Sequence, residues 1–155
     1  RSVGLAGASI PLLVFGVIVI AGRLVGARVP DRFGPGRVAS VALALSAVGL
    51  VVLGLVPTTV GLIVGTAIFA SGVAFTMPAL ISLSVSRVPA EERGTVVGTT
   101  AIFIDVAFGI SPVILGVLAV GTGTGATFVL SGVIAAIGSL ALVVRREALR
   151  HPAVA

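Results

Sequence analysis

The side chains that could carry chemistry are few, and most of them are charged groups near the ends of long apolar segments. Asp105 is the exception, because it is the only charged residue between Arg93 and Arg145. A carboxylate is costly to bury in hydrocarbon, so such a residue must be paired, hydrated or protonated. We therefore take Asp105 as a candidate proton or substrate site. The structural alternative is a carboxylate that is hydrogen-bonded across a tight helix contact.

The composition excludes several other kinds of site. The chain has no cysteine, and its single histidine, His151, lies in the C-terminal tail. These counts exclude disulfides, thiolate metal sites, cysteine nucleophiles, and hydrolase or metal centres built on histidine. Asp105 alone offers too little ionisable chemistry for acid–base catalysis within the apolar segments. We therefore expect neither an enzyme nor a bound cofactor or metal.

The elements that position Asp105 must be membrane helices. Hydrophobic residues make up 57% of the 155 residues and charged residues 10%, and the mean hydropathy is +1.29. A soluble domain is about 45–50% apolar and about 25% charged, and a membrane helix needs about 20 apolar residues. We predict an all-α integral membrane bundle of about five transmembrane helices, over residues 3–25, 38–56, 60–85, 95–118 and 126–144. Residues 145–155 form a basic tail.

The arginines indicate how these spans are oriented. All except Arg1 lie in or beside residues 26–37, residues 86–94 and the tail, whereas the turns at 57–59 and 121–125 carry no charge. The positive-inside rule makes the arginine side cytoplasmic, with the C-terminus inside and the N-terminus outside. We expect at least one preceding helix to be missing from the chain. No aromatic residues are interleaved with the arginines, so we expect no nucleic-acid partner.

The loop before the second span contains a cluster of charges made of Arg28, Asp31, Arg32 and Arg37. Its prolines and glycines should prevent any helix there. Asp31 can lie against a helix N-terminus and pair with Arg28 or Arg32. Such a cluster could act as a gate that locks two helical bundles together in one conformation and releases them in another. The alternative is an anchoring loop whose arginines only set the orientation.

Two loops resemble signatures of the major facilitator superfamily. In the first, Asp31, Arg32 and Gly34 match the Asp-Arg-x-Gly pattern, and Arg37 supplies the downstream basic residue. Ala27 and Pro30 depart from the usual pattern, which favours the weaker copy that joins the eighth and ninth helices. The second loop, Arg87-Val88-Pro89-Ala90-Glu91-Glu92-Arg93-Gly94, is similar to the one between the tenth and eleventh helices. The five spans would then be helices eight to twelve, like those of an efflux permease.

A stripe of small residues shares a helix face with Asp105, at about 100° per residue. It is formed by Gly94, Gly98, Ala101, Gly109, Pro112 and Gly116. We expect this stripe to face protein or a water-filled cavity, with Gly98, Gly109 and Gly116 as helix-packing glycines. The opposite face should contact lipid, and it carries Val96, Phe103, Ile110, Ile114 and Leu118. The pairs Gly22/Gly26, Gly61/Gly65 and Gly94/Gly98 also have the spacing of close helix contacts.

The resemblance implies part of the C-terminal half of a secondary transporter, most simply one that exports a drug, a sugar or a similar small molecule in exchange for protons by alternating access. The alternatives are a proton-coupled uptake permease for a sugar or an organic acid, and a membrane interaction or assembly subunit that does not transport. The expected partners are the lipid bilayer, the missing N-terminal half, the small-molecule substrate and protons. The expected location is the bacterial inner membrane, with the C-terminus in the cytoplasm.

The orientation can be tested by cysteine labelling in intact cells. A cysteine introduced at Thr58 should react with a membrane-impermeant thiol reagent from outside, and one introduced at Ala90 should not, because arginine-rich segments are retained inside. The native chain has no cysteine that would react in the background. The reverse pattern of labelling would overturn the predicted orientation.

Overall fold

The computed structural model describes residues 5–26, 29–86 and 88–150, and the described backbone is helical with no strand. The elements are α1 (Leu5–Gly26), α2 (Val29–Phe33), α3 (Pro35–Leu55), α4 (Thr59–Val85), the short 3-10 turn η1 (Ala90–Glu92), α5 (Arg93–Thr122) and α6 (Thr124–Arg150). Helices α3, α4, α5 and α6 are each long and apolar enough to cross a membrane, and α1 adds the apolar stretch Ser9–Leu24. The predicted all-α membrane bundle is confirmed.

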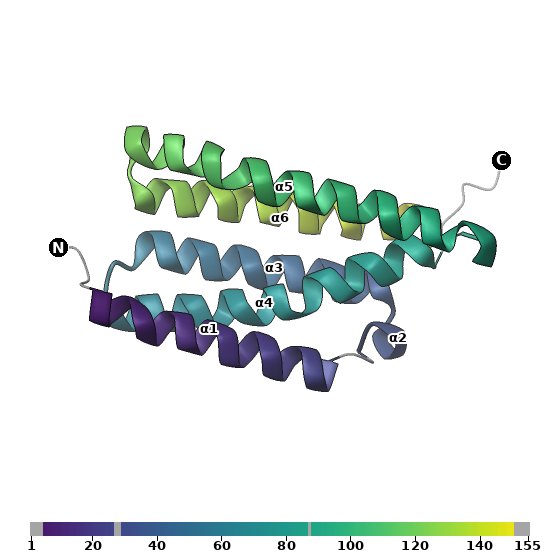
Figure 1. Cartoon of the computed structure of the whole chain (residues 1–155), viewed down its shortest axis with the longest axis horizontal. Helices are drawn as coiled ribbons and strands as arrows, with labels where there is room; N and C mark the ends of the chain where they lie inside the picture. Colours follow the sequence, from purple (N-terminus) through teal and green to yellow (C-terminus); the bar gives the residue numbers. More distant parts are fainter. Residues whose placement is uncertain (1–4, 27–28, 87, 151–155) are drawn as a thin grey trace.

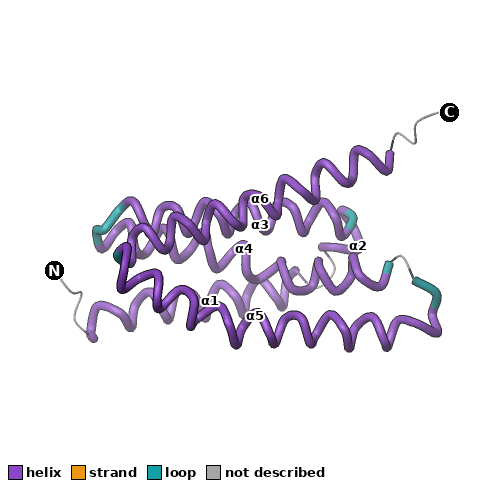
Figure 2. The backbone as a smooth tube through the Cα atoms, turned by 90° about the horizontal axis from the view of Figure 1, so that it is seen from above, coloured by secondary structure: helices purple, strands orange, loops and turns teal. Residues whose placement is uncertain are grey.

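The long helices run alongside one another, and α4 has a central place among them. Helix α4 contacts α3, α1 and α5, and α6 packs mainly on α3. Figure 1 shows α5 and α1 at opposite edges of the bundle, and Figure 2 shows them on the same side of it. The α2 segment and the α4–α5 connection lie at one end, and the α3–α4 and α5–α6 turns lie at the other (Figure 1). The arginine-bearing connections therefore share one end of the bundle.

The helices approach one another closely because their contacts are made by small residues. The buried apolar residues among those described are all alanines: Ala39, Ala42, Ala47, Ala70, Ala74 and Ala79. At Gly72 of α4, an added Cβ would collide with the Ser46 side chain and would lie 2.6 Å from the carbonyl oxygen of Ala42, both on α3. Lipid tails are as apolar as leucine, so helices in a membrane associate through such close packing.

Hydroxyl groups within the bundle are satisfied mainly inside their own helices. Ser46 donates a hydrogen bond to the carbonyl oxygen of Ala42, four residues earlier, at 3.0 Å, and Thr76 does the same to Gly72 at 2.8 Å. Ser139 differs, because its hydroxyl crosses from α6 to the carbonyl oxygen of Ser40 on α3, at 2.8 Å in a buried position. This bond ties the last helix to the middle of the bundle.

The loop around the charge cluster is more helical than we expected. The prediction that its prolines and glycines prevent any helix is wrong, since α2 forms over Val29–Phe33 and α3 already begins at Pro35. Proline is tolerated in a first helical turn, where its missing N–H has no intrahelical partner. Gly34 separates the two helices with a φ of 86°, a conformation that side chains other than glycine rarely adopt.

The last two helices are also longer than the predicted spans. Helix α5 ends at Thr122 and α6 begins at Thr124, so Gly123 alone, with a φ of 87°, connects them. Helix α6 continues to Arg150, and the first part of the basic tail is therefore helical. The uncharged turn is shorter than the segment 121–125 because Gly121 and Thr122 remain in the helix.

The tight contact between α3 and α4 predicts a strong effect of one methyl group. Gly72→Ala should lower the free energy of unfolding of the purified protein by about 1–3 kcal/mol, because the added Cβ meets backbone that cannot move aside cheaply. The matched control is Gly16→Ala in α1, where an added Cβ meets nothing within 4 Å. This variant should be as stable as the wild type or more stable by up to about 1 kcal/mol, because alanine favours a helix more than glycine does. Denaturation in mixed micelles measures both, and equal midpoints would contradict the tight contact.

Candidate functional site

Asp105 lies well inside the longest of the described helices. Helix α5 has 30 residues, so it is about 45 Å long, and Asp105 lies about 18 Å from its first residue. That length exceeds the hydrocarbon thickness of about 30 Å. The carboxylate is therefore far from either end of the helix, and its place near the middle of the membrane remains a prediction.

Asp105 and its neighbouring small residues are exposed in the described structure. Helix α5 lies at the edge of the bundle in both views (Figure 1 and Figure 2), and none of its residues is buried. Asp105 itself is exposed. An added Cβ at Gly98, Gly109 or Gly116 would meet nothing within 4 Å. These glycines therefore do not pack against another described helix, and a helix-packing role for them remains a prediction about parts of the protein beyond these helices.

The face of α5 that turns toward the bundle differs from the one expected. Its partly covered residues are mostly larger, namely Val96, Thr100, Ile104, Leu115, Leu118 and Ala119. Val96 and Leu118, which we expected to contact lipid, thus lie on the side of α4 and α6, while Phe103 is 72% exposed. The periodicity of one helix separates its small and bulky faces but does not say which neighbour covers each.

The other proposed packing glycines do lie at close contacts. At Gly22 an added Cβ would lie 2.7 Å from the Cβ of Ala74, and at Gly65 it would lie 2.8 Å from a side-chain carbon of Leu53. At Gly26 it would collide with the ring of Phe75, and at Gly61 with Val56. Gly94 has open space instead. Glycine spacing alone therefore identified contacts in α1 and α4 but not in α5.

The charge cluster lies at the arginine-rich end of the bundle, around α2. Arg32 ends this short helix and Arg37 lies in the first turn of α3, and both are exposed. Asp31 lies within α2, but its side chain is outside the described part of the chain, as is the whole of Arg28. The pairing of Asp31 with Arg28 or Arg32, and the gating role of the cluster, remain predictions.

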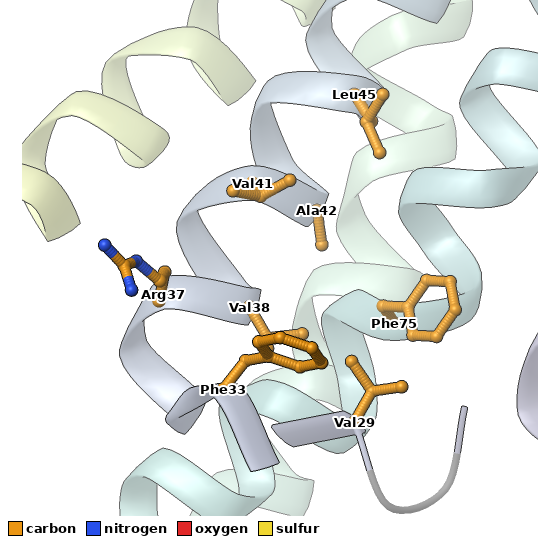
Figure 3. A pocket seen from close by; sticks show the side chains of 8 residues that line it. All are labelled: Val29, Phe33, Arg37, Val38, Val41, Ala42, Leu45 and Phe75. Carbon is orange, nitrogen blue, oxygen red and sulfur yellow. The ribbon is translucent and has the colours of Figure 1, made fainter. Parts of the chain in front are cut away.

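A pocket beside α2 was not foreseen from the sequence. Its volume is about 320 Å³, and it lies between α2, α3 and α4, as Figure 3 shows. The lining residues are Val29, Phe33, Arg37, Val38, Val41, Ala42, Leu45 and Phe75. Val29 and Phe33 are four residues apart, which places them on the same face of a helix. This spacing is the signal in the sequence that could have predicted a short apolar helix in the loop.

No group of three or more histidine, cysteine, aspartate or glutamate residues that could hold a metal ion occurs in the described ranges. The described charged groups singled out from the sequence lie on different helices. They are the carboxylate of Asp105 on α5 and the guanidinium groups of Arg32 on α2 and Arg37 on α3.

Comparison with known proteins gives a consistent result over nearly the whole chain. A family model described as Major Facilitator Superfamily matches residues 2–154. An uncharacterized MFS-type transporter of Salmonella typhimurium is 34% identical over 128 residues, which cover 83% of this chain and 33% of that protein. Uncharacterized MFS-type transporters of Burkholderia mallei and Burkholderia pseudomallei are 34% identical over 131 residues, covering 84% of this chain and 32% of theirs.

The chain thus spans about a third of the length of the curated relatives that it matches. No solved structure matches it significantly.

Proposed function

Because the chain belongs to the major facilitator superfamily, we propose that it forms part of a secondary active transporter that moves a small molecule across the membrane by alternating access. Transporters built from two helical bundles place their substrate site near the bilayer midplane, where the bundles meet, and rock around it. The relatives are about three times as long as this chain, so a second bundle would come from the rest of the protein. This second bundle would contact the face of the described helices that no other described helix covers.

The observation that carries this proposal is the exposed carboxylate of Asp105 on an uncovered helix face. A helix that presented this face to lipid would place a charge against hydrocarbon, which is costly. Partner helices or a water-filled path would remove that cost. The open space beside Gly98, Gly109 and Gly116 would let a partner backbone or a substrate come close.

The chemistry of Asp105 supports coupling to protons, and we propose export as the direction because the spans of the chain resemble those of an efflux permease. A carboxylate that faces alternately each side of a membrane can bind a proton on one side and release it on the other. The same negative charge would repel an organic acid, so the proposed cargo is a neutral or cationic small molecule such as a drug or a sugar. A proton-coupled uptake permease for a sugar remains the second candidate, since Asp105 serves either direction of flow.

We further propose that the arginine-rich end of the bundle faces the cytoplasm of a bacterial cell. Arg32, Arg37, Arg93 and Arg145 lie in the connections and helix ends of that side, and all four are exposed. Retention of arginine on the cytoplasmic side supports this orientation. The C-terminal end of α6 would then be cytoplasmic as well.

The role of Asp105 is tested by two substitutions in the full-length transporter. Asp105→Asn keeps the volume and the hydrogen-bonding capacity but cannot ionise, and it should lose most gradient-driven transport while inserting normally. Asp105→Glu keeps the charge and should retain part of the activity. Transport rates at matched membrane abundance measure both effects.

A purely structural Asp105 would give the opposite order. Asparagine would then be tolerated, whereas the longer glutamate would crowd the stripe at Ala101, Gly109 and Pro112 and disturb the fold. Wild-type flux in the asparagine variant would end the functional claim for this residue and leave the family assignment untouched.

A second test concerns the need for the rest of the transporter. The 155-residue chain expressed alone should insert into the membrane but show no gradient-dependent flux in liposomes, because α5 exposes its polar face with no partner. Co-expression of the remaining segment, as found in the longer relatives, should restore transport. Flux by the chain alone would show that the described helices form a complete path.

A further inference from the structure

The pocket beside α2 lies where the apolar part of the bundle meets its arginine-rich end. It is formed by the short helix α2, the first turns of α3, and Phe75 of α4 (Figure 3). Among the described residues, seven of the eight lining side chains are apolar, and the eighth belongs to Arg37. An occupant would therefore be apolar where it enters the pocket.

The pocket continues into an exposed apolar surface along α3. Val41 is 54% exposed and Leu45 38%, and both line the pocket. Val48, two turns beyond Val41, is 53% exposed. Exposed apolar side chains on a membrane-spanning helix are suited to contact acyl chains, which are as apolar as leucine. A lipid chain that lies along this surface can thus enter the pocket without leaving hydrocarbon.

Charge at the mouth of the pocket distinguishes one kind of lipid from another. Arg37 is exposed, and its guanidinium group points away from Phe75, out of the pocket (Figure 3). Arg32 is also exposed, at the end of α2. None of the described lining residues is acidic. A guanidinium group is well suited to bind phosphate, because its planar fork matches two phosphate oxygens.

We propose that this pocket binds an anionic phospholipid of the leaflet at the arginine-rich end, with an acyl chain between α2 and α3 and the phosphate on Arg37. An anionic phospholipid combines apolar acyl chains, which fit the pocket, with a negatively charged headgroup, which would lie at its arginine-bearing mouth. Basic pockets between helices are suited to bind such headgroups. The proposal depends on the membrane location of the chain, and not on its transport activity or on Asp105.

The test uses the full-length protein in nanodiscs that contain a trace of phosphatidylglycerol with a photoreactive acyl chain. Cross-links should map to peptides that contain Phe33, Val41 or Leu45, and they should saturate as the phosphatidylglycerol content rises. Arg37→Gln should weaken this binding about five- to tenfold, because one charged contact is lost. The matched control is Arg145→Gln, which removes an exposed arginine of α6 outside the pocket and should leave the cross-links unchanged.

A second pair of variants tests the acyl-chain part of the site independently of charge. Val41→Trp should fill the pocket and lower the labelling of its lining peptides severalfold. Val48→Trp places the same side chain at an equally exposed position two turns away and should have no effect. Both positions are exposed, so neither variant should disturb the buried packing of α3.

Three outcomes would overturn the proposal. Equal labelling by photoreactive phosphatidylcholine would show that the negative charge does not matter. Full displacement of the phosphatidylglycerol by millimolar inorganic phosphate would identify free phosphate as the ligand of Arg37. Absence of any lipid cross-link at the pocket, with normal labelling along the rest of α3, would show that another segment of the protein covers it.

Discussion

Helices α3 and α4 approach each other so closely that only glycine fits at two of their points of contact. The positions of the other helices follow from this contact. Gly72 lies against the Ala42 carbonyl and the Ser46 backbone, and Gly49 lies against the backbone of Phe69. Helix α4 uses one face for α3 and its other faces for α1 and α5. Helix α3 packs against α6 with the face that α4 leaves free. Among the described residues no large side chain is fully buried. The bundle therefore depends on such close contacts, since hydrocarbon gives no hydrophobic drive for association.

The sequence predicted those parts of the structure that depend on one helix at a time. Hydropathy located the spans, and the arginines predicted which connections share an end of the bundle, because burial in hydrocarbon imposes both patterns directly. The error at α2 came from treating Pro30 as a helix breaker without regard to its place in the first turn. Helix boundaries shifted where Gly121 and Thr122 stayed helical, since glycine is tolerated within membrane helices.

The candidate site shows the limit of the same reasoning. Asp105 was identified because a charge within an apolar helix is unusual, and its stripe was identified from helical periodicity. Neither property says which neighbour the face meets, and in the structure Val96 and Leu118 turn toward the bundle instead. The pocket at Phe33, Val41 and Phe75 joins residues from three helices, and only the tertiary arrangement brings them together.

The bond from Ser139 to Ser40 joins residues 99 positions apart, and this separation has a consequence for how the protein is made. During synthesis α3 leaves the ribosome before α4 and α5, and its partner α6 follows all three. Until then, the face of α3 that carries Ser40 and Ala47 must lie against lipid or against the insertion machinery. The contact between α3 and α6 therefore forms only after α4, α5 and α6 have all been made. A chain truncated before α6 would therefore leave this small-residue face of α3 without the partner that covers it in the structure.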